Sequence, residues 1–175
     1  MTREVRERRL ASPVRVTLAH VLGGAIDGAW WPHSASIARE LPELIEVISP
    51  RLGEIVAISV NWSSLQASPD LDVLCGAKPA LPGNLVNRQR LMMVKGSEAS
   101  ANLLVVPCRT SSTLAVMLLR QAADLPIMPS ELSSQMFRAG DHIVRAARVE
   151  SELCDSRLRA GAADTNDFAG AAAAE

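Results

Sequence analysis

The sequence predicts an α+β domain: a mostly antiparallel sheet of about five or six strands, packed by a long kinked helix and followed by a C-terminal helical arm. Apolar residues recur at every second position in residues 14–20, which is the period of a half-buried strand. The period lengthens to that of a helix in residues 37–52. Two apolar runs, at 91–94 and 103–106, are close enough in sequence to form a hairpin.

The first two strands flank a glycine turn. The first strand lies in residues 14–20, and Gly23 and Gly24 end it. The segment AIDGAWW, residues 25–31, is extended again until Pro32 stops it.

The first helix follows from an apolar stripe. Ser34 or Ser36 is expected to cap its N-terminus by accepting a hydrogen bond from a free backbone N–H. Pro42 lies inside the stripe and predicts a kink or restart, while Pro50 and Gly53 mark the C-terminal end. The stripe consists of Ile37, Leu41, Leu44, Ile45, Ile48 and Leu52.

Further strands are expected after this helix. Residues 54–62 predict a strand whose alternate side chains share a face, and LDVLC, residues 71–75, is a shorter run. The two hairpin strands are apolar at consecutive positions, which indicates central strands covered on both faces. The alternating face of the 54–62 strand carries Val56, Ile58, Val60 and Trp62.

Two helical segments complete the chain. Ser111 or Ser112 begins a helix, and a longer, weaker stripe runs through residues 130–159. The domain organisation that follows is a flexible arm at 1–12, the α+β domain at 13–125, a helical extension at 126–159 and a disordered tail at 160–175.

The net charge, the hydrophobicity and the cysteine content of the chain exclude several classes of function. A net charge of −1 gives no general attraction to nucleic acid or to an acidic membrane surface. No apolar run is long enough to span a bilayer, and the charged N-terminus does not resemble a secretory signal, so we expect a cytoplasmic protein. Cys75, Cys108 and Cys154 are widely spaced and contain no C-x-x-C pair, which favours reduced, packed thiols.

Two of the three tryptophans are adjacent. On an extended backbone neighbouring side chains point to opposite faces, so Trp30 and Trp31 cannot form one flat platform. We expect Trp30 and Trp62 to be structural, and Ser34 to be structural as a helix cap. The alternative for Trp31 is that it lines a ligand-binding groove with Asp27 and His33.

The tryptophan motif also carries a resemblance. DGAWWPHS, followed by ELPEL in the helix, resembles the D-G-A-W-W-P-[R/H]-S signature of an uncharacterised actinobacterial domain-of-unknown-function family. The resemblance continues in VNW at 60–62 and LLVVP at 103–107, and it spans about residues 14–125. It implies a compact α+β domain and supplies no activity. The family usually has Arg at the position of His33.

A search for catalytic chemistry finds no convincing arrangement. Asp27, His33 and Ser34 are the residue types of a hydrolytic triad, but the tight G-x-S-x-G elbow is absent. The histidines have no partner at metal-ligand spacing, and no phosphate-binding glycine motif is present. The sequence therefore predicts no catalytic residue, no metal and no cofactor.

The leading hypothesis is a small, non-enzymatic cytoplasmic protein that acts through protein–protein contact. Residues 130–159 are the expected surface for a homo-oligomer or another protein partner, with no nucleic acid and no membrane involved. The alternative is small-molecule binding, or hydrolase- or transferase-like chemistry, in the region of Asp27, Trp31 and His33.

Overall fold

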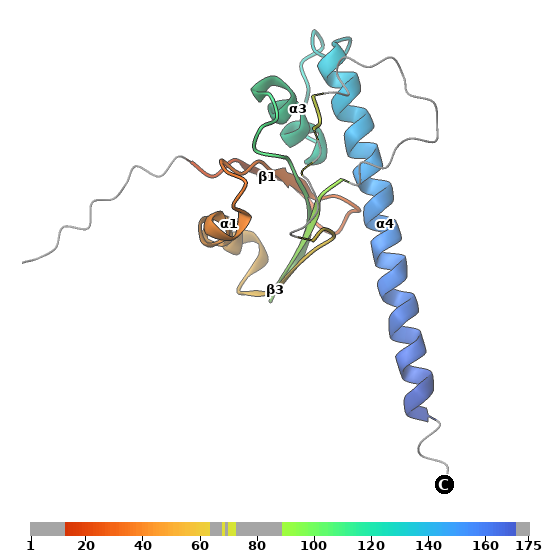
Figure 1. Ribbon diagram of the computed structural model, residues 1–175. Coiled ribbons are helices and arrows are strands. Elements are labelled where there is room, and N and C mark those ends of the chain that lie inside the picture. Colours follow the sequence, from red (N-terminus) through yellow and green to blue (C-terminus); the bar gives the residue numbers. More distant parts are fainter. Residues whose placement is uncertain (1–12, 64–67, 69, 73–88, 171–175) are drawn as a thin grey trace, which may run out of the picture.

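The computed structural model describes residues 13–63, 68, 70–72 and 89–170, with side chains as far as residue 162. The five strands form one sheet in the order β1-β2-β5-β4-β3. Figure 1 shows the sheet as a middle layer, with α1 on one side and α3 and α4 on the other. The α+β class is confirmed. The elements are β1 (Val16–Leu18), β2 (Gly28–Trp30), α1 (Ile37–Leu52), β3 (Ile55–Val60), β4 (Leu91–Gly96), β5 (Ser100–Val105), α3 (Ser112–Ala122) and α4 (Gln135–Gly170).

The predicted hairpin forms the centre of the sheet. β4 and β5 are antiparallel, with Leu91 opposite Leu104 and Lys95 opposite Ser100. Leu104 belongs to the hydrophobic cluster beneath α3 and α4, whereas Leu103 belongs to the cluster beneath α1. Both faces of β5 are therefore covered, as the unbroken apolar run predicts.

The one parallel pairing in the sheet joins β2 to β5. Gly28 lies opposite Leu103, and Trp30 lies opposite Val105. Because the strands are parallel, both end at the same edge of the sheet. The chain leaves β2 for α1 on one face and leaves β5 for α3 on the opposite face. This divergence of the two connections positions the candidate site described below.

Helix α1 covers one face of the sheet through its apolar stripe. Leu44, Ile48 and Leu52 are fully buried there. The helix does not restart at Pro42, although the sequence predicts a kink or restart. Pro42 lies in the second turn, so its missing N–H leaves only the carbonyl of the exposed Ala38 to be hydrated by water.

Strand β3 lies at the edge of the sheet, and its alternation differs from the sequence prediction. Ile58 and Trp62 pack against the α1-side cluster, whereas Val56 is 67% exposed and Val60 45% exposed. The register of β3 on β4 shifts between Ile55 and Ala57. A bulge of this kind redirects the side chains around it, which sequence alternation alone does not reveal.

The opposite face of the sheet is covered by α3 and by the first half of α4. Ile143, Val144 and Ala147 of α4 are buried in one cluster with Leu114 and Leu118 of α3. The arm therefore docks on the domain in its first half, while Figure 1 shows its second half continuing past the sheet.

Helix α4 also differs in length from the segment predicted. It begins at Gln135 rather than at residue 130 and continues to Gly170, past the predicted end at 159. The added turns are rich in alanine, which has the highest intrinsic helix propensity. The composition of residues 160–175 predicts a disordered tail because few of their side chains can be buried, whereas residues 160–170 are helical.

Some predictions concern residues outside the described part of the chain. These are the arm at 1–12, the LDVLC run from Val73 onward and the last residues, 171–175. In the described part, none of the helices combines the length and hydrophobicity needed to cross a membrane.

Candidate functional site

Asp27 opens the DGAWWP motif and is only 1% exposed. Its Oδ1 accepts hydrogen bonds from the backbone N–H groups of Gly23 at 2.8 Å and Gly24 at 2.7 Å. Its Oδ2 accepts one from the N–H of Asn102 in β5, at 2.9 Å. The carboxylate therefore fastens the glycine turn to the sheet, and a buried acid bonded in this way acts as structure.

Gly28 follows and lets β1 approach β2 closely. Its φ is +157°, and a Cβ placed on it would overlap the carbonyl oxygen of Thr17. No other residue fits this position without moving β1. The close approach sets the positions of the two tryptophans that come next.

Trp30 and Trp31 point into different clusters. Trp30 is 1% exposed and packs with Leu44 beneath α1. Trp31 is 7% exposed and packs with Leu104 and Leu114 beneath α3. The indoles therefore diverge, as the extended backbone requires, and they form no exposed platform.

Arg15 holds the Trp31 segment against β1. Its guanidinium carbon lies 3.5 Å from the centre of the Trp31 ring. Its Nε donates to the carbonyl of Trp31 at 3.0 Å, and its Nη2 donates to the carbonyl of Pro32 at 2.7 Å. Burial lowers the pKa of Arg15, against the raising effect of Glu40 and Cys108. Trp31 Nε1 is buried without a hydrogen-bond partner among the described residues.

The turn into α1 is organised by Glu40 rather than by a serine cap. The Glu40 carboxylate accepts from the N–H of His33 at 2.8 Å, from the N–H of Ser34 at 2.7 Å and from the Ser34 hydroxyl at 2.6 Å. Ser36 is the N-cap residue and makes no capping bond with its side chain. Ser34 thus donates to an acid of the first turn, because the loop brings it alongside Glu40. The sequence prediction had it accept from the backbone.

The structure does not gather Asp27, Trp31 and His33 around one cavity. Asp27 and Trp31 are buried on protein partners, while the His33 side chain is 37% exposed. His33 Nδ1 lies 3.6 Å from Glu40 Oε2, an ion pair when the imidazole is protonated. The motif therefore shapes the backbone that surrounds a different site.

That site is a crevice of about 550 Å³ at the carboxyl ends of β2 and β5. Its walls come from the segments after these strands, from the start of β4 and from residues 70–72. A crevice of this kind arises where two neighbouring parallel strands send their connections to opposite faces, and ligands of open sheets bind there. Trp31 packs behind it, in one cluster with the lining residues Leu71 and Val106.

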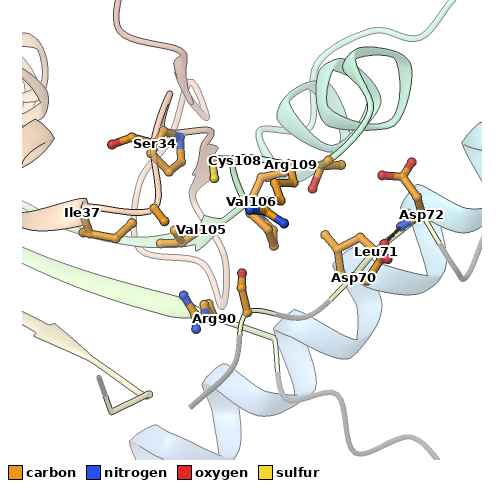
Figure 2. Close-up of a pocket in the computed structure, with 15 residues that line it drawn as sticks. Ser34, Ile37, Asp70, Leu71, Asp72, Arg90, Val105, Val106, Cys108 and Arg109 are labelled. Carbon is orange, nitrogen blue, oxygen red and sulfur yellow. Dashed lines mark hydrogen bonds between the residues drawn. The ribbon is translucent and has the colours of Figure 1, made fainter. Parts of the chain in front are cut away.

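Charged groups line the crevice from several directions. Figure 2 shows Arg109 and Arg90 on opposite sides of Val106, with Asp70 and Asp72 together on another wall. Burial lowers the pKa of Arg90, whose guanidinium carbon lies 5.3 Å from the centre of the Trp62 ring. Arginine remains cationic at any physiological pH, so both guanidinium groups carry full charge.

Two hydroxyl residues stand at the entrance to α3. The hydroxyl of Ser111 donates to Asp72 Oδ1 at 2.5 Å, and its N–H donates to Oδ2 at 2.9 Å. Thr110 is 6% exposed and lines the crevice, and its Oγ1 has no hydrogen-bond partner among the described residues. Asp72 thus caps α3, while Thr110 retains an unused donor.

Sequence reasoning missed this crevice because its residues come from four separate segments. The available signals were weak: Arg90 and Arg109 flank the predicted hairpin, and a hydroxyl-rich run follows Arg109. The parallel pairing of β2 with β5 creates the crevice, and a pairing between strands so distant in sequence cannot be read from periodicity.

The sequence also matches a known protein family. The family model described as a family of unknown function, DUF5994, matches residues 15–122, more than half of the chain. The chain belongs to the DUF5994 family. The DUF5994 match extends from β1 to the end of α3, so it includes every wall of the crevice and leaves α4 outside. Searches of curated proteins and of solved structures found no significant match to this DUF5994 protein.

Proposed function

We propose that the protein binds a small organic molecule in the crevice at the carboxyl ends of β2 and β5. The observation that carries this proposal is the divergence of the connections after two parallel strands, which opens the space between Ile37 and Arg109. Its volume of about 550 Å³ lies within the range of ligand pockets, roughly 300–1,000 Å³. An apolar floor with a few polar groups is also typical of such pockets.

We propose binding rather than catalysis. Cys108 is the strongest nucleophile type in the lining, and catalysis by a thiol also needs a general base to take up its proton. Among the described lining residues there is no histidine to serve as that base. Recognition by shape and charge is the activity that the lining supports best.

Filling the crevice tests the proposal. Ala35 is exposed and lines the crevice, so Ala35→Trp places an indole in the ligand volume without removing a core side chain. Ala38 is exposed in the first turn of α1 and does not line it, so Ala38→Trp is the matched control. Thermal-shift and NMR screening of a fragment library should find compounds that stabilise the wild type and Ala38→Trp but not Ala35→Trp. Hits that stabilise all three proteins equally would refute the crevice as the binding site.

A second candidate function, self-association through α4, is favoured by one observation. Val149 and Leu153 are 57% and 47% exposed on the side of α4 that faces away from the sheet. With Ala146 they follow the three- and four-residue spacing by which helices pair, and Ala160 lies one heptad after Leu153. We propose a second copy of this chain as the occupant, because a pair of identical stripes is self-complementary and alanines permit close approach of two helices.

The oligomeric state tests this candidate directly. Sedimentation of the full chain should show a dimer that the double variant Val149→Glu, Leu153→Glu converts to a monomer. Glu152→Gln, at an exposed position between them, is the control and should leave the dimer intact. A wild type that stays monomeric at millimolar concentration rules out this second function.

A further inference from the structure

We propose that the molecule bound in the crevice is an organic anion, whose carboxylate or phosphate oxygens contact Arg109 and Thr110. The inference rests on the proposed function and adds the chemical class of the ligand. It follows from which of the charged and polar groups at the crevice already have a hydrogen-bond or ion-pair partner among the described residues.

Arg109 provides a charge that the protein leaves unused. Its side chain is exposed and lines the crevice directly after Cys108. Among the described residues it makes neither a hydrogen bond nor an ion pair. A guanidinium presents a planar set of N–H donors that matches the oxygens of a carboxylate or a phosphate.

Thr110 provides a buried donor that points to the same kind of ligand. Its N–H donates to the carbonyl of Pro107 at 3.0 Å, but its hydroxyl Oγ1 is unpartnered in the described part of the chain. A buried hydroxyl without a partner is costly, because it has lost its hydrogen bonds to water. Rotation about its Cα–Cβ bond would direct the hydroxyl of this lining residue towards a bound oxygen.

The acidic residues of the crevice do not neutralise this pair. Asp72 is already compensated, since it accepts two hydrogen bonds from Ser111 at the positive end of α3. Asp70 Oδ1 accepts the backbone N–H of Asp72 at 3.1 Å, which directs that oxygen within its own turn.

The remainder of the crevice indicates an organic rather than a simple inorganic anion. Ile37, Val105 and Val106 supply an apolar floor, and the volume of about 550 Å³ exceeds that of a phosphate ion many times over. A carbon skeleton on this floor would place its charged group at the Arg109 end.

Small probe molecules of similar shape test the contribution of the ligand's charge separately from that of its carbon skeleton. Benzoate and phenyl phosphate are the anionic probes, and benzamide is the uncharged probe of similar shape. We expect NMR titration to show the two anions binding at least about tenfold more tightly than benzamide, with affinity falling as salt rises. Comparing the two anions identifies which charged group is preferred.

Variants locate the contact. Arg109→Gln should weaken anion binding by about tenfold and reduce its salt dependence, and Thr110→Val should weaken it a few-fold. Arg39→Gln is the control, because Arg39 is an exposed arginine that does not line the crevice. Each variant is first checked for an unchanged melting temperature, and Thr110→Ala replaces Thr110→Val if the latter does not fold.

The outcomes distinguish the two proposals. If benzamide binds as tightly as benzoate, or if Arg109→Gln binds anions like the wild type, the anionic class is wrong and the crevice remains a binding site. If neither the probes nor any library fragment shifts the crevice resonances, the proposed function fails and takes this inference with it.

Discussion

The guanidinium carbon of Arg15 lies 3.5 Å from the centre of the Trp31 ring, and the same side chain donates hydrogen bonds to the carbonyls of Trp31 and Pro32. One side chain, from the residue directly before β1, therefore fixes both the ring and the backbone of the segment that leaves β2. That segment leads directly to Ser34, at the crevice wall. The position of the crevice wall thus depends on the contact between Arg15 and Trp31, even if a ligand touches neither side chain.

Arg15→Ala should destabilise the fold by about 1–3 kcal/mol, because it removes a cation–π contact and two hydrogen bonds. Urea unfolding followed by tryptophan fluorescence measures the free energy of unfolding. Arg15→Lys keeps the charge but cannot reproduce the paired bonds, so it should fall between the alanine variant and the wild type. Arg39→Ala, at an exposed position, is the control. Equal stability of all four proteins would show that Arg15 does not hold the segment.

Asp27→Asn should cost on the order of 3 kcal/mol of unfolding free energy. The amide keeps the size of the carboxylate but turns one acceptor oxygen into a donor, which then faces a backbone N–H inside the protein. Hydrogen exchange measured by NMR should show the amides of Gly24 and Asn102 losing protection. Unchanged exchange at both amides would contradict the fastening role assigned to Asp27.

The pH dependence of the unfolding free energy should reveal how much ionised Glu40 stabilises the turn into α1. Burial raises the pKa of Glu40, but the hydrogen bonds from Ser34 and from the His33 N–H outweigh it and leave the pKa below its ordinary value of 4.5. A lowered folded-state pKa means that ionised Glu40 stabilises the fold above the unfolded pKa, and that this stabilisation disappears as pH falls through the folded pKa. Because the turn is partly exposed, we expect less than about 1 kcal/mol.

Unfolding free energies of the wild type and of Glu40→Gln, measured between pH 7 and about pH 3, test this sign. The wild type should be more stable at neutral pH, and the difference should shrink as pH falls towards the acidic end. Glu43→Gln, at a neighbouring exposed position, is the control. A gap that widens towards low pH would mean that the pKa of Glu40 is raised.

The sequence predicted the local features of this protein well. The period of two in residues 14–20, the stripe of α1 and the doubly covered strands β4 and β5 each depend on neighbours along the chain. The divergence of Trp30 and Trp31 follows from the geometry of an extended backbone.

The features that could not be predicted from the sequence depend on pairing between residues that are far apart along the chain. The parallel contact of β2 with β5 joins residues about 75 positions apart, as Gly28 and Leu103 show. It creates the crevice and brings Arg90 and Arg109 to it. Asp27 was an alternative candidate ligand residue because alternation along the strand places it on the same face as Trp31. The hydrogen bond from the distant N–H of Asn102 shows that its carboxylate is bound within the sheet instead.

The docking of α4 can be tested with two aliphatic residues on opposite sides of the same helix. Ile143 is fully buried against the α3-side cluster, and Val149 is 57% exposed. Ile143→Ala should therefore lower the unfolding free energy by about 2–4 kcal/mol through lost burial and a cavity, whereas Val149→Ala should change it by less than about 0.5 kcal/mol. Urea unfolding at protein concentrations low enough to exclude association measures both. If the two substitutions cost the same, α4 does not pack on the domain through the face that contains Ile143, and the α3-side cluster would have to be closed by α3 alone.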